Sequence, residues 1–495
     1  MQKWKWAWGG VLGVFGVFGG FARAQMPVWS DPEDPPVLAA GESTGFGQAL
    51  AWWGSRLVIG APRSHRNGER AGVLWNAPAW GGEKPVPWGG APAPLPWQAL
   101  GYSLAALPGS QLLAAGAPLA PGDGSDPGRV YLLAPGPTEM RLHRVLEGTD
   151  AHGGFGQVLA PAFGGLWVAA PFARDAAGAV RTGAVSGFFP ADCDAERAIR
   201  LESPFPGQEA QFGAALACSG DWLAVAAPET LSGGAVCLYR RAAQQWNLHT
   251  ILEAPRIDGR GFGSALAWQA GGTRLFVGAP RHGEGGVVFV CEFGAGHWRL
   301  AAEEHRAPVG LAGFGSSLAW GQAGLWVGAP RSLGGCGGLV WLLDPGTVPD
   351  LAWVIPGQAP REAFGASLLS RGDQCLAAAP GMGVADFLPA VRGWVAGFGE
   401  PAAGPMRVPS GEAQGRWIQP RGLGFRCCIW GLMPGQAGLL RVDGGPGALG
   451  AGLGGQADRH GHLWIEADQG LAQGDWTLTL RLAGSASRHY RVAVP

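Results

Sequence analysis

Three arginines occupy one repeated position in this chain, and their side chains are the ones best suited to binding. Arg63, Arg281 and Arg331 each follow a Gly-Ala-Pro tripeptide directly. Guanidinium groups gathered on one rim can hold carboxylates or sulfated sugars through paired hydrogen bonds. The candidate ligand-binding residues are therefore these arginines and their polar neighbours, namely Arg63, Arg281, Arg331, His282, Asp258 and Glu362.

The same arginines have a structural interpretation. Each could pair with a carboxylate in a segment between repeats, such as Asp258 or Glu362, and so hold neighbouring repeats together. We favour this second interpretation, and both stay open at this point.

Motifs that carry catalysis are missing from the chain. It has no His-Glu-x-x-His and no Gly-x-x-x-x-Gly-Lys, and its one Gly-x-Ser-x-Gly match, at 41–45, lies in a Gly-rich turn region rather than between a strand and a helix. None of the eight cysteines forms a Cys-x-x-Cys pair, so we interpret them as buried small side chains and predict no metal or other cofactor. Arg371-Gly372-Asp373 matches a tripeptide that integrins bind, but it falls where each repeat needs a hairpin turn, and we favour the turn.

A repeat positions all of these residues. Seven times between Phe46 and Pro380 the chain has Phe-Gly, an apolar run, a turn and a second apolar run that ends in Ala-Pro. The second copy, 101–118, has Tyr102 in place of phenylalanine. The Phe or Tyr positions lie 50–57 residues apart, which is typical of units too small to fold alone.

Each repeat unit contains about four short β-branched or aromatic runs separated by Gly-rich turns, as antiparallel meanders do. Four strands in each of seven units predict an all-β fold, a seven-bladed β-propeller. In such a meander the loops after Ala-Pro and the segments between repeats fall on one face. The charged candidates should therefore share that face.

The repeated Phe-Gly and Ala-Pro motifs resemble the FG-GAP repeat of integrin α-subunits and related bacterial surface proteins over about residues 36–398. The resemblance implies a propeller used for surface recognition. Calcium-binding members carry an Asp-x-Asp-x-Asp-Gly loop between the Phe-Gly strand and the strand that ends in Ala-Pro. The corresponding loops here have at most one carboxylate each. We therefore expect integrin-like calcium sites to be absent.

The ends of the chain differ from the repeats. Residues 1–24 combine Lys3 and Lys5 with an apolar stretch and small residues before position 25, as secretory signal peptides do. We predict a propeller over 25–399, with Pro36–Ala39 as the closing strand of the last blade. A Pro/Gly-rich linker follows at 400–415, and residues 416–495 have the strand pattern of a bacterial Ig-like β-sandwich.

The sequence predicts a secreted, periplasmic or cell-surface protein that binds or adheres to a protein or glycan through the charged loop face. A net charge of −1 excludes nucleic acid as a partner attracted by bulk charge. No transmembrane anchor is expected after cleavage of the signal. Two alternatives stay open: a polysaccharide hydrolase or lyase with its site at the central mouth of the ring, and a structural scaffold of the cell envelope.

Overall fold

The computed structural model describes residues 28–30, 44–78, 85–88, 95–118, 127–135, 140–162, 164–189, 198–242, 245–255, 260–283, 285–306, 312–322, 324–331, 339–343, 351–356, 363–372, 374–380, 394–398, 415–421, 424–430, 437–443, 453–456, 463–467, 474–482 and 488–494. Every helix or strand assigned in these residues is a β-strand. The described residues fall into two compact units, one ending at Phe398 and one running from Gly415 onward.

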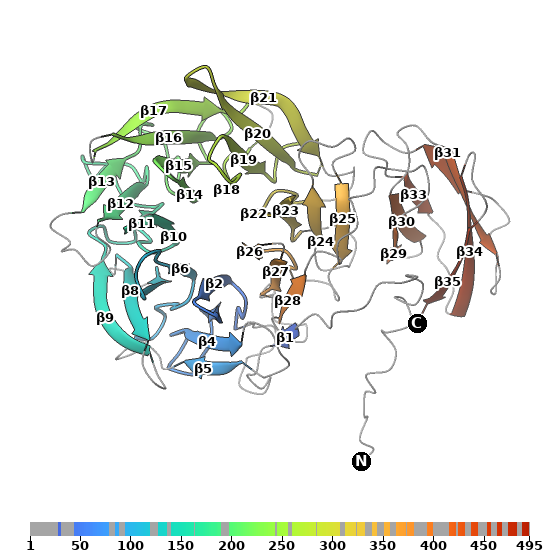
Figure 1. The fold of residues 1–495 in the computed structure, drawn as a ribbon, viewed down its shortest axis with the longest axis horizontal. Helices are drawn as coiled ribbons and strands as arrows, with labels where there is room; N and C mark the ends of the chain where they lie inside the picture. The colour runs from blue at the N-terminus through green and yellow to red at the C-terminus, as the bar shows by residue number, and fades with distance from the viewer. Residues whose placement is uncertain are drawn as a thin grey trace, which may run out of the picture. The chain divides into compact units, whose positions relative to one another are not determined.

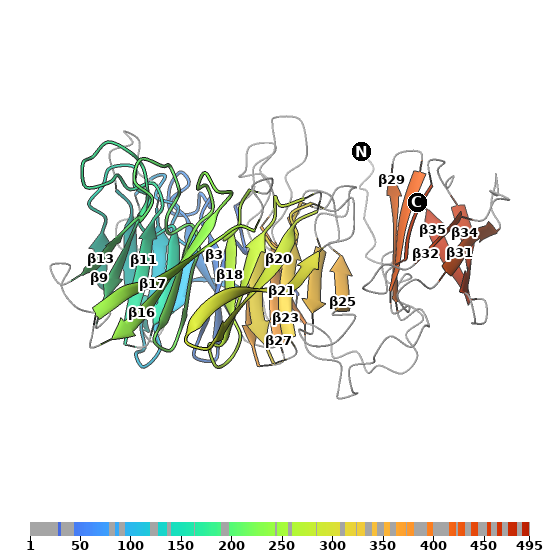
Figure 2. The same ribbon diagram turned by 90° about the horizontal axis from the view of Figure 1, so that it is seen from above.

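The first unit is a ring of four-stranded antiparallel sheets, and Figure 1 shows them arranged around a common centre. The inner strands β2, β6, β10, β14, β18, β22 and β26 contact one another in that order, and β26 contacts β2. Figure 2 views the ring from its edge, with the strands running between two loop-bearing faces. The predicted fold class, an all-β propeller, is confirmed.

We number the sheets along the chain. The first four contain β2 (Ala49–Trp53), β3 (Arg56–Ala61), β4 (Val73–Pro78) and β5 (Val86–Trp88); β6 (Ser103–Ala106), β7 (Leu113–Ala117), β8 (Arg129–Pro135) and β9 (Met140–Glu147); β10 (Val158–Ala162), β11 (Gly165–Ala170), β12 (Ala184–Phe188) and β13 (Ile199–Glu202); and β14 (Leu216–Ser219), β15 (Trp222–Ala227), β16 (Ala235–Ala242) and β17 (Gln245–Glu253). The last three contain β18 (Ala265–Trp268), β19 (Arg274–Ala279), β20 (Val287–Gly294) and β21 (His297–Arg306); β22 (Ser317–Gly321), β23 (Gly324–Ala329), β24 (Leu339–Leu343) and β25 (Leu351–Pro356); and β26 (Ser367–Arg371), β27 (Gln374–Ala379), β28 (Trp394–Phe398) and β1 (Val28–Ser30).

The last sheet is completed by the N-terminal strand β1, which pairs antiparallel with β28 in the register Val28↔Ala396 and Ser30↔Trp394. The sequence assigned this outermost position to Pro36–Ala39, and that assignment is corrected here. Residues 36–39 lie outside the described residues. A strand supplied from the opposite end of the chain protects the otherwise open edge of β28.

In each repeat, a backbone hydrogen bond joins the Phe-Gly motif to the Ala-Pro motif. The amide of the glycine in Phe-Gly donates to the carbonyl of the residue before Ala-Pro, as in Gly263 to Gly278 at 3.0 Å. In the second repeat Gly101 makes this bond to Gly116, so Leu100, which is buried, takes the phenylalanine position. The prediction that Tyr102 fills it was wrong, because a leucine before glycine lacked the aromatic signature.

In the four repeats that have glycine before Ala-Pro, the packing of one sheet on the next leaves no space for a side chain at that glycine. A Cβ placed on Gly278 would lie 2.0 Å from the carbonyl oxygen of Gly315 in the sixth sheet. Gly60 has the same relation to Gly101 at 2.0 Å. A side chain at either glycine would overlap the backbone of the next sheet, so glycine in this tripeptide indicates that neighbouring sheets approach closely.

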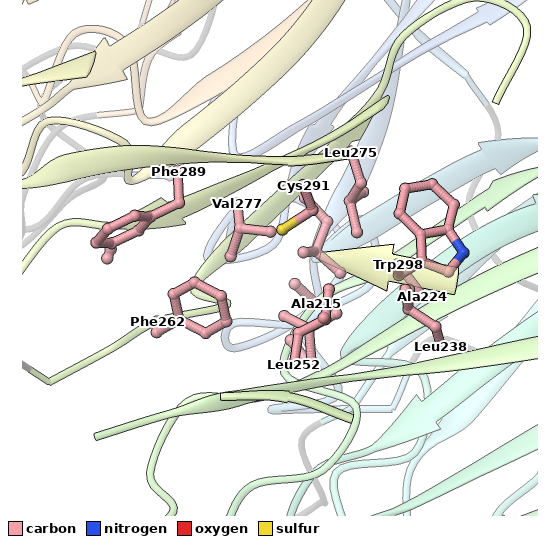
Figure 3. Packing of buried hydrophobic residues seen from close by; sticks show 14 of the residues in the cluster. Ala215, Ala224, Leu238, Leu252, Phe262, Leu275, Val277, Phe289, Cys291 and Trp298 are labelled. Atoms are coloured by element: carbon pink, nitrogen blue, oxygen red, sulfur yellow. The ribbon is translucent and has the colours of Figure 1, made fainter. Parts of the chain in front are cut away.

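The apolar core lies between the sheets, where each sheet covers the face of its neighbour. Figure 3 shows one such cluster, in which Ala224 and Leu238 of the fourth sheet meet Phe262, Val277 and Phe289 of the fifth. All five side chains are buried. Burying one large apolar side chain contributes about 1.5–3 kcal/mol, so each interface between sheets stabilises the ring.

The second unit contains two antiparallel sheets. The strand order is β29-β30-β33 in one, made of β29 (Gly415–Arg421), β30 (Gly424–Trp430) and β33 (Leu463–Ala467). The other has the order β32-β31-β34-β35, made of β32 (Leu453–Gln456), β31 (Ala437–Asp443), β34 (Gly474–Leu482) and β35 (Arg488–Val494). Its assignment as an Ig-like module stays a prediction.

Candidate functional site

One face of the ring carries the loops that follow Ala-Pro together with the segments that lead to the next inner strand. Both kinds of loop lie on the same side because the four strands of each sheet alternate in direction. We call this side the Ala-Pro face. The hairpin turns between first and second strands lie on the opposite face.

The three candidate arginines lie in equivalent places on the Ala-Pro face. Each packs against the left-handed glycine that precedes Phe-Gly in its own repeat, and the pairs are Arg63 with Gly45, Arg281 with Gly261 and Arg331 with Gly313. Gly261, for example, has φ +84°, and a Cβ on it would lie 3.1 Å from Nε of Arg281. The structure therefore places all three beside the starts of inner strands.

Arg281 forms an ion pair between sheets. Its Nη2 donates to Oε1 of Glu229, and the exposed fractions of the two side chains are 45% and 26%. Glu229 follows Ala-Pro in the fourth repeat, so it holds the same repeat position one sheet earlier. The sequence placed the partner in a segment between repeats, at Asp258 or Glu362, and both of these lie outside the described residues. Aligning the repeats by position would have identified Glu229.

Arg331 differs from Arg281 in its surroundings. It is exposed, and it has no ion pair with any residue in the described part of the chain. The equivalent position in the preceding sheet is Arg281, whose charge is already matched by Glu229. The repeat geometry that supplies Arg281 with a carboxylate therefore supplies Arg331 with a like charge.

Arg63 lies at the boundary between the first and second sheets. Its backbone amide donates to the carbonyl of Thr44 at 2.8 Å, which fixes the start of the loop. Burial raises the pKa of the Tyr102 phenol, and the nearby Arg63 guanidinium opposes that rise. Arg63 thus lies near an aromatic residue, Tyr102, that leads into the next sheet.

His282 is an anchor inside its loop. Its side chain is 4% exposed and meets Phe289 edge to face, with the ring centroids 5.2 Å apart. The amide of Gly286 donates to its carbonyl at 3.2 Å and closes the loop. The residues at the same repeat position in three other sheets are also buried, namely Ser64, Ala173 and Thr230. Its burial leaves little of the His282 ring for a ligand.

The inner strands give no acid–base pair to the centre of the ring. None of the seven, β2, β6, β10, β14, β18, β22 and β26, contains Asp or Glu. Polysaccharide hydrolysis generally requires two carboxyl groups placed on either side of the scissile bond. Carboxylates for such a reaction would have to come from loops.

Arg371 is the charged residue of these inner strands, and it links the last sheet to the first. Its guanidinium carbon lies 5.2 Å from the centroid of the Trp52 ring, and Nη1 donates to the carbonyl of Gly54 at 2.9 Å. Both contacts use the group that an integrin would need in an Arg-Gly-Asp ligand. Asp373 lies outside the described residues. The contacts support the structural interpretation of this tripeptide.

The described thiols are structural. Cys218, Cys237, Cys291 and Cys375 are free, and burial raises the pKa of each, to about 12 for Cys218 and Cys237. A protonated thiol is a poor nucleophile, so thiol catalysis by these four has no support. Within the described ranges, no three His, Cys, Asp or Glu side chains are placed to hold a metal ion. The same ranges contain no helix able to span a membrane.

No family model matches the chain, and no curated protein matches it significantly. Among solved structures it is similar to Saccharomyces cerevisiae Sqt1, with 9% sequence identity, a TM-score of 0.46, and coverage of 73% of this chain and 97% of Sqt1. It is also similar to U3-55K, with 14% identity, a TM-score of 0.45, and coverage of 76% of this chain and 99% of U3-55K. The propeller assignment depends on the strand pairing described above.

Proposed function

We propose that this protein is a non-catalytic binding protein that recognises a protein or glycan through the Ala-Pro face of its propeller. One observation carries the proposal: arginines at one repeat position lie over left-handed glycines on that face, and Arg331 has no carboxylate partner in the described chain. An exposed guanidinium with no carboxylate partner among the described residues suits recognition of an anionic group.

Catalysis is the weaker candidate. A hydrolase or lyase at the central mouth requires converging carboxylates, and the inner strands contain none. Three of the four described thiols are buried, Cys218 is partly buried, and burial raises the pKa of all four. A purely structural role in an envelope complex would use the same face and differs only in how long the partner stays bound.

The setting of this binding follows from the sequence. The signal-like segment 1–24 supports export, and the resemblance to FG-GAP proteins supports a place in the periplasm, at the cell surface or outside the cell. In this proposal the C-terminal sheets act as a spacer or docking unit, as an Ig-like module would. Calcium and other cofactors have no part in it.

The test is capture of partners from native extracellular and envelope material on the immobilised chain. The informative variant is Arg63→Ala/Arg331→Ala, which keeps Arg281 and its ion pair with Glu229 intact. Arg299→Ala, an exposed arginine on the outer strand β21, is the matched control. A partner lost only with the double variant supports the proposal. A partner kept by every variant, or turnover of a polysaccharide by the wild-type chain, contradicts it.

A further inference from the structure

Leu231 is the most exposed large apolar side chain in the described part of the chain. Its exposed fraction is 84%, and the next highest is 53% for Val86. Leu231 lies in the loop after Ala-Pro of the fourth sheet, on the Ala-Pro face. The third residue after Ala-Pro is His65, Arg174 or Gly283 in three other described loops, and the sequence has Pro121, Leu333 and Gly383 at this position in the remaining repeats. Among the described loops, leucine occurs there only in the fourth sheet.

The loop holds Leu231 in one place. Its backbone amide donates to Oε1 of Gln208 at 3.1 Å, and the amide of Gly234 donates to Oγ1 of Thr230 at 3.0 Å. Thr230 is buried, and its hydroxyl lies 3.0 Å from that of Ser232. Because the loop is already ordered, little conformational entropy is lost when Leu231 enters a partner.

Leu231 lies two residues after Glu229, which begins a row of charged residues in three successive sheets. The row is Glu229, Arg281 and Arg331, one residue at the same repeat position in the fourth, fifth and sixth sheets. Arg281 reaches back to the carboxylate of Glu229. Arg331 is exposed at the equivalent position of the next sheet, and the Glu229 pair shows that a carboxylate is a suitable partner for an arginine at this repeat position.

We propose that this surface, Leu231 with Arg281 and Arg331, docks an acidic segment of a partner protein. An apolar side chain of the segment packs on Leu231, and a carboxylate pairs with Arg331. The inference rests on the proposed function and names the partner class. A peptide is favoured over a sulfated glycan because it presents an apolar group and a carboxylate within a few residues of each other, whereas a sulfated sugar offers Leu231 little to bury.

The experiment is a selection of peptides from a random phage-displayed library on the full chain, followed by fluorescence anisotropy with the enriched peptide labelled with fluorescein. Arg331→Glu and Leu231→Ser are each expected to raise its Kd by about tenfold or more. The matched controls are Arg299→Glu and Leu248→Ser, since both residues are exposed on outer strands. The controls should leave the Kd unchanged. Arg331 has no described ion pair, so its variant should fold normally.

Enrichment of peptides with Asp or Glu next to an apolar residue, together with this pattern of losses, supports the inference. Enriched peptides without acidic residues, or equal binding to all variants, overturn it. A heparin oligosaccharide is the alternative ligand. If the chain binds it, and Arg331→Glu weakens this binding while Leu231→Ser does not, the inference of an acidic peptide partner is contradicted and a glycan is favoured. In that case the proposed binding function stands. A wild-type chain that captures neither peptides nor native partners removes both.

Discussion

Gly278→Ala tests whether the glycine of the Gly-Ala-Pro motif is needed because the fifth and sixth sheets approach closely there. The added Cβ would lie 2.0 Å from the carbonyl oxygen of Gly315, whereas ordinary contacts begin at 3.4 Å. Gly315 cannot easily turn away, because its amide donates to the carbonyl of Gly328 at 3.1 Å. The fifth and sixth sheets must therefore separate locally, at a cost of about 2–3 kcal/mol in the free energy of unfolding. Urea unfolding followed by tryptophan fluorescence measures this loss.

Gly294→Ala is the matched control for that experiment. Gly294 is the last residue of β20, lacks a positive φ, and has no atom within 4 Å of the added Cβ. Alanine there should be neutral or stabilise the protein by about 0.4–1 kcal/mol through the unfolded state. The fourth sheet has Ala226 at the position equivalent to Gly278, so some sheet pairs accept a methyl group. If Gly278→Ala changes the unfolding free energy by less than about 0.5 kcal/mol, the sheet spacing is adjustable and our reasoning fails.

Alanine at Glu229 and Arg281, singly and together, should give a coupling energy of about 0.2–1 kcal/mol in urea unfolding, because both side chains are partly exposed. A coupling of zero would show that the pair does not hold the fourth and fifth sheets together. Arg371→Ala should destabilise the ring by about 1–2 kcal/mol through loss of its contacts with the first sheet. An unchanged thermal midpoint would contradict that link. Cys218 and Cys237, with pKa values raised to about 12 by burial, should resist iodoacetamide at about pH 8 in the folded protein. Unfolded thiols ionise near pH 9, so the stability from burying them neutral is lost as pH rises from about 9 to about 12. Rapid labelling of either thiol, mapped by mass spectrometry, would disagree with the structure.

The fold was predictable because its signals are local and repeated. The Phe262-Gly263 pair recurs in six of the seven repeats, and a glycine or alanine equivalent to Gly278 follows 14 or 16 residues after the phenylalanine. Each repeat thus places an apolar residue, a tight turn and a small residue where a strand needs them. Leu100 was missed because the repeat was identified by an aromatic residue, whereas leucine occupies the same buried position in the second repeat. The closing strand was misassigned because a three-residue strand has too little pattern to be found, and its partner β28 is remote in the sequence.

The candidate site was only partly predictable. The repeat position of Arg63, Arg281 and Arg331 put them on one face, since loop direction follows from strand alternation. Their partners depend on which sheet lies next to which. Glu229 is 52 residues from Arg281, and only ring packing brings the two side chains together.

Composition and repetition alone thus determined that this chain folds into an all-β propeller whose charged loops share one face, because strand and turn preferences act over a few residues. Tertiary structure decided which side chains of that face stay available. It buried His282 against Phe289, paired Arg281 with Glu229 and left Leu231 exposed. These outcomes depend on contacts between neighbouring sheets, where distance in space is unrelated to distance along the chain.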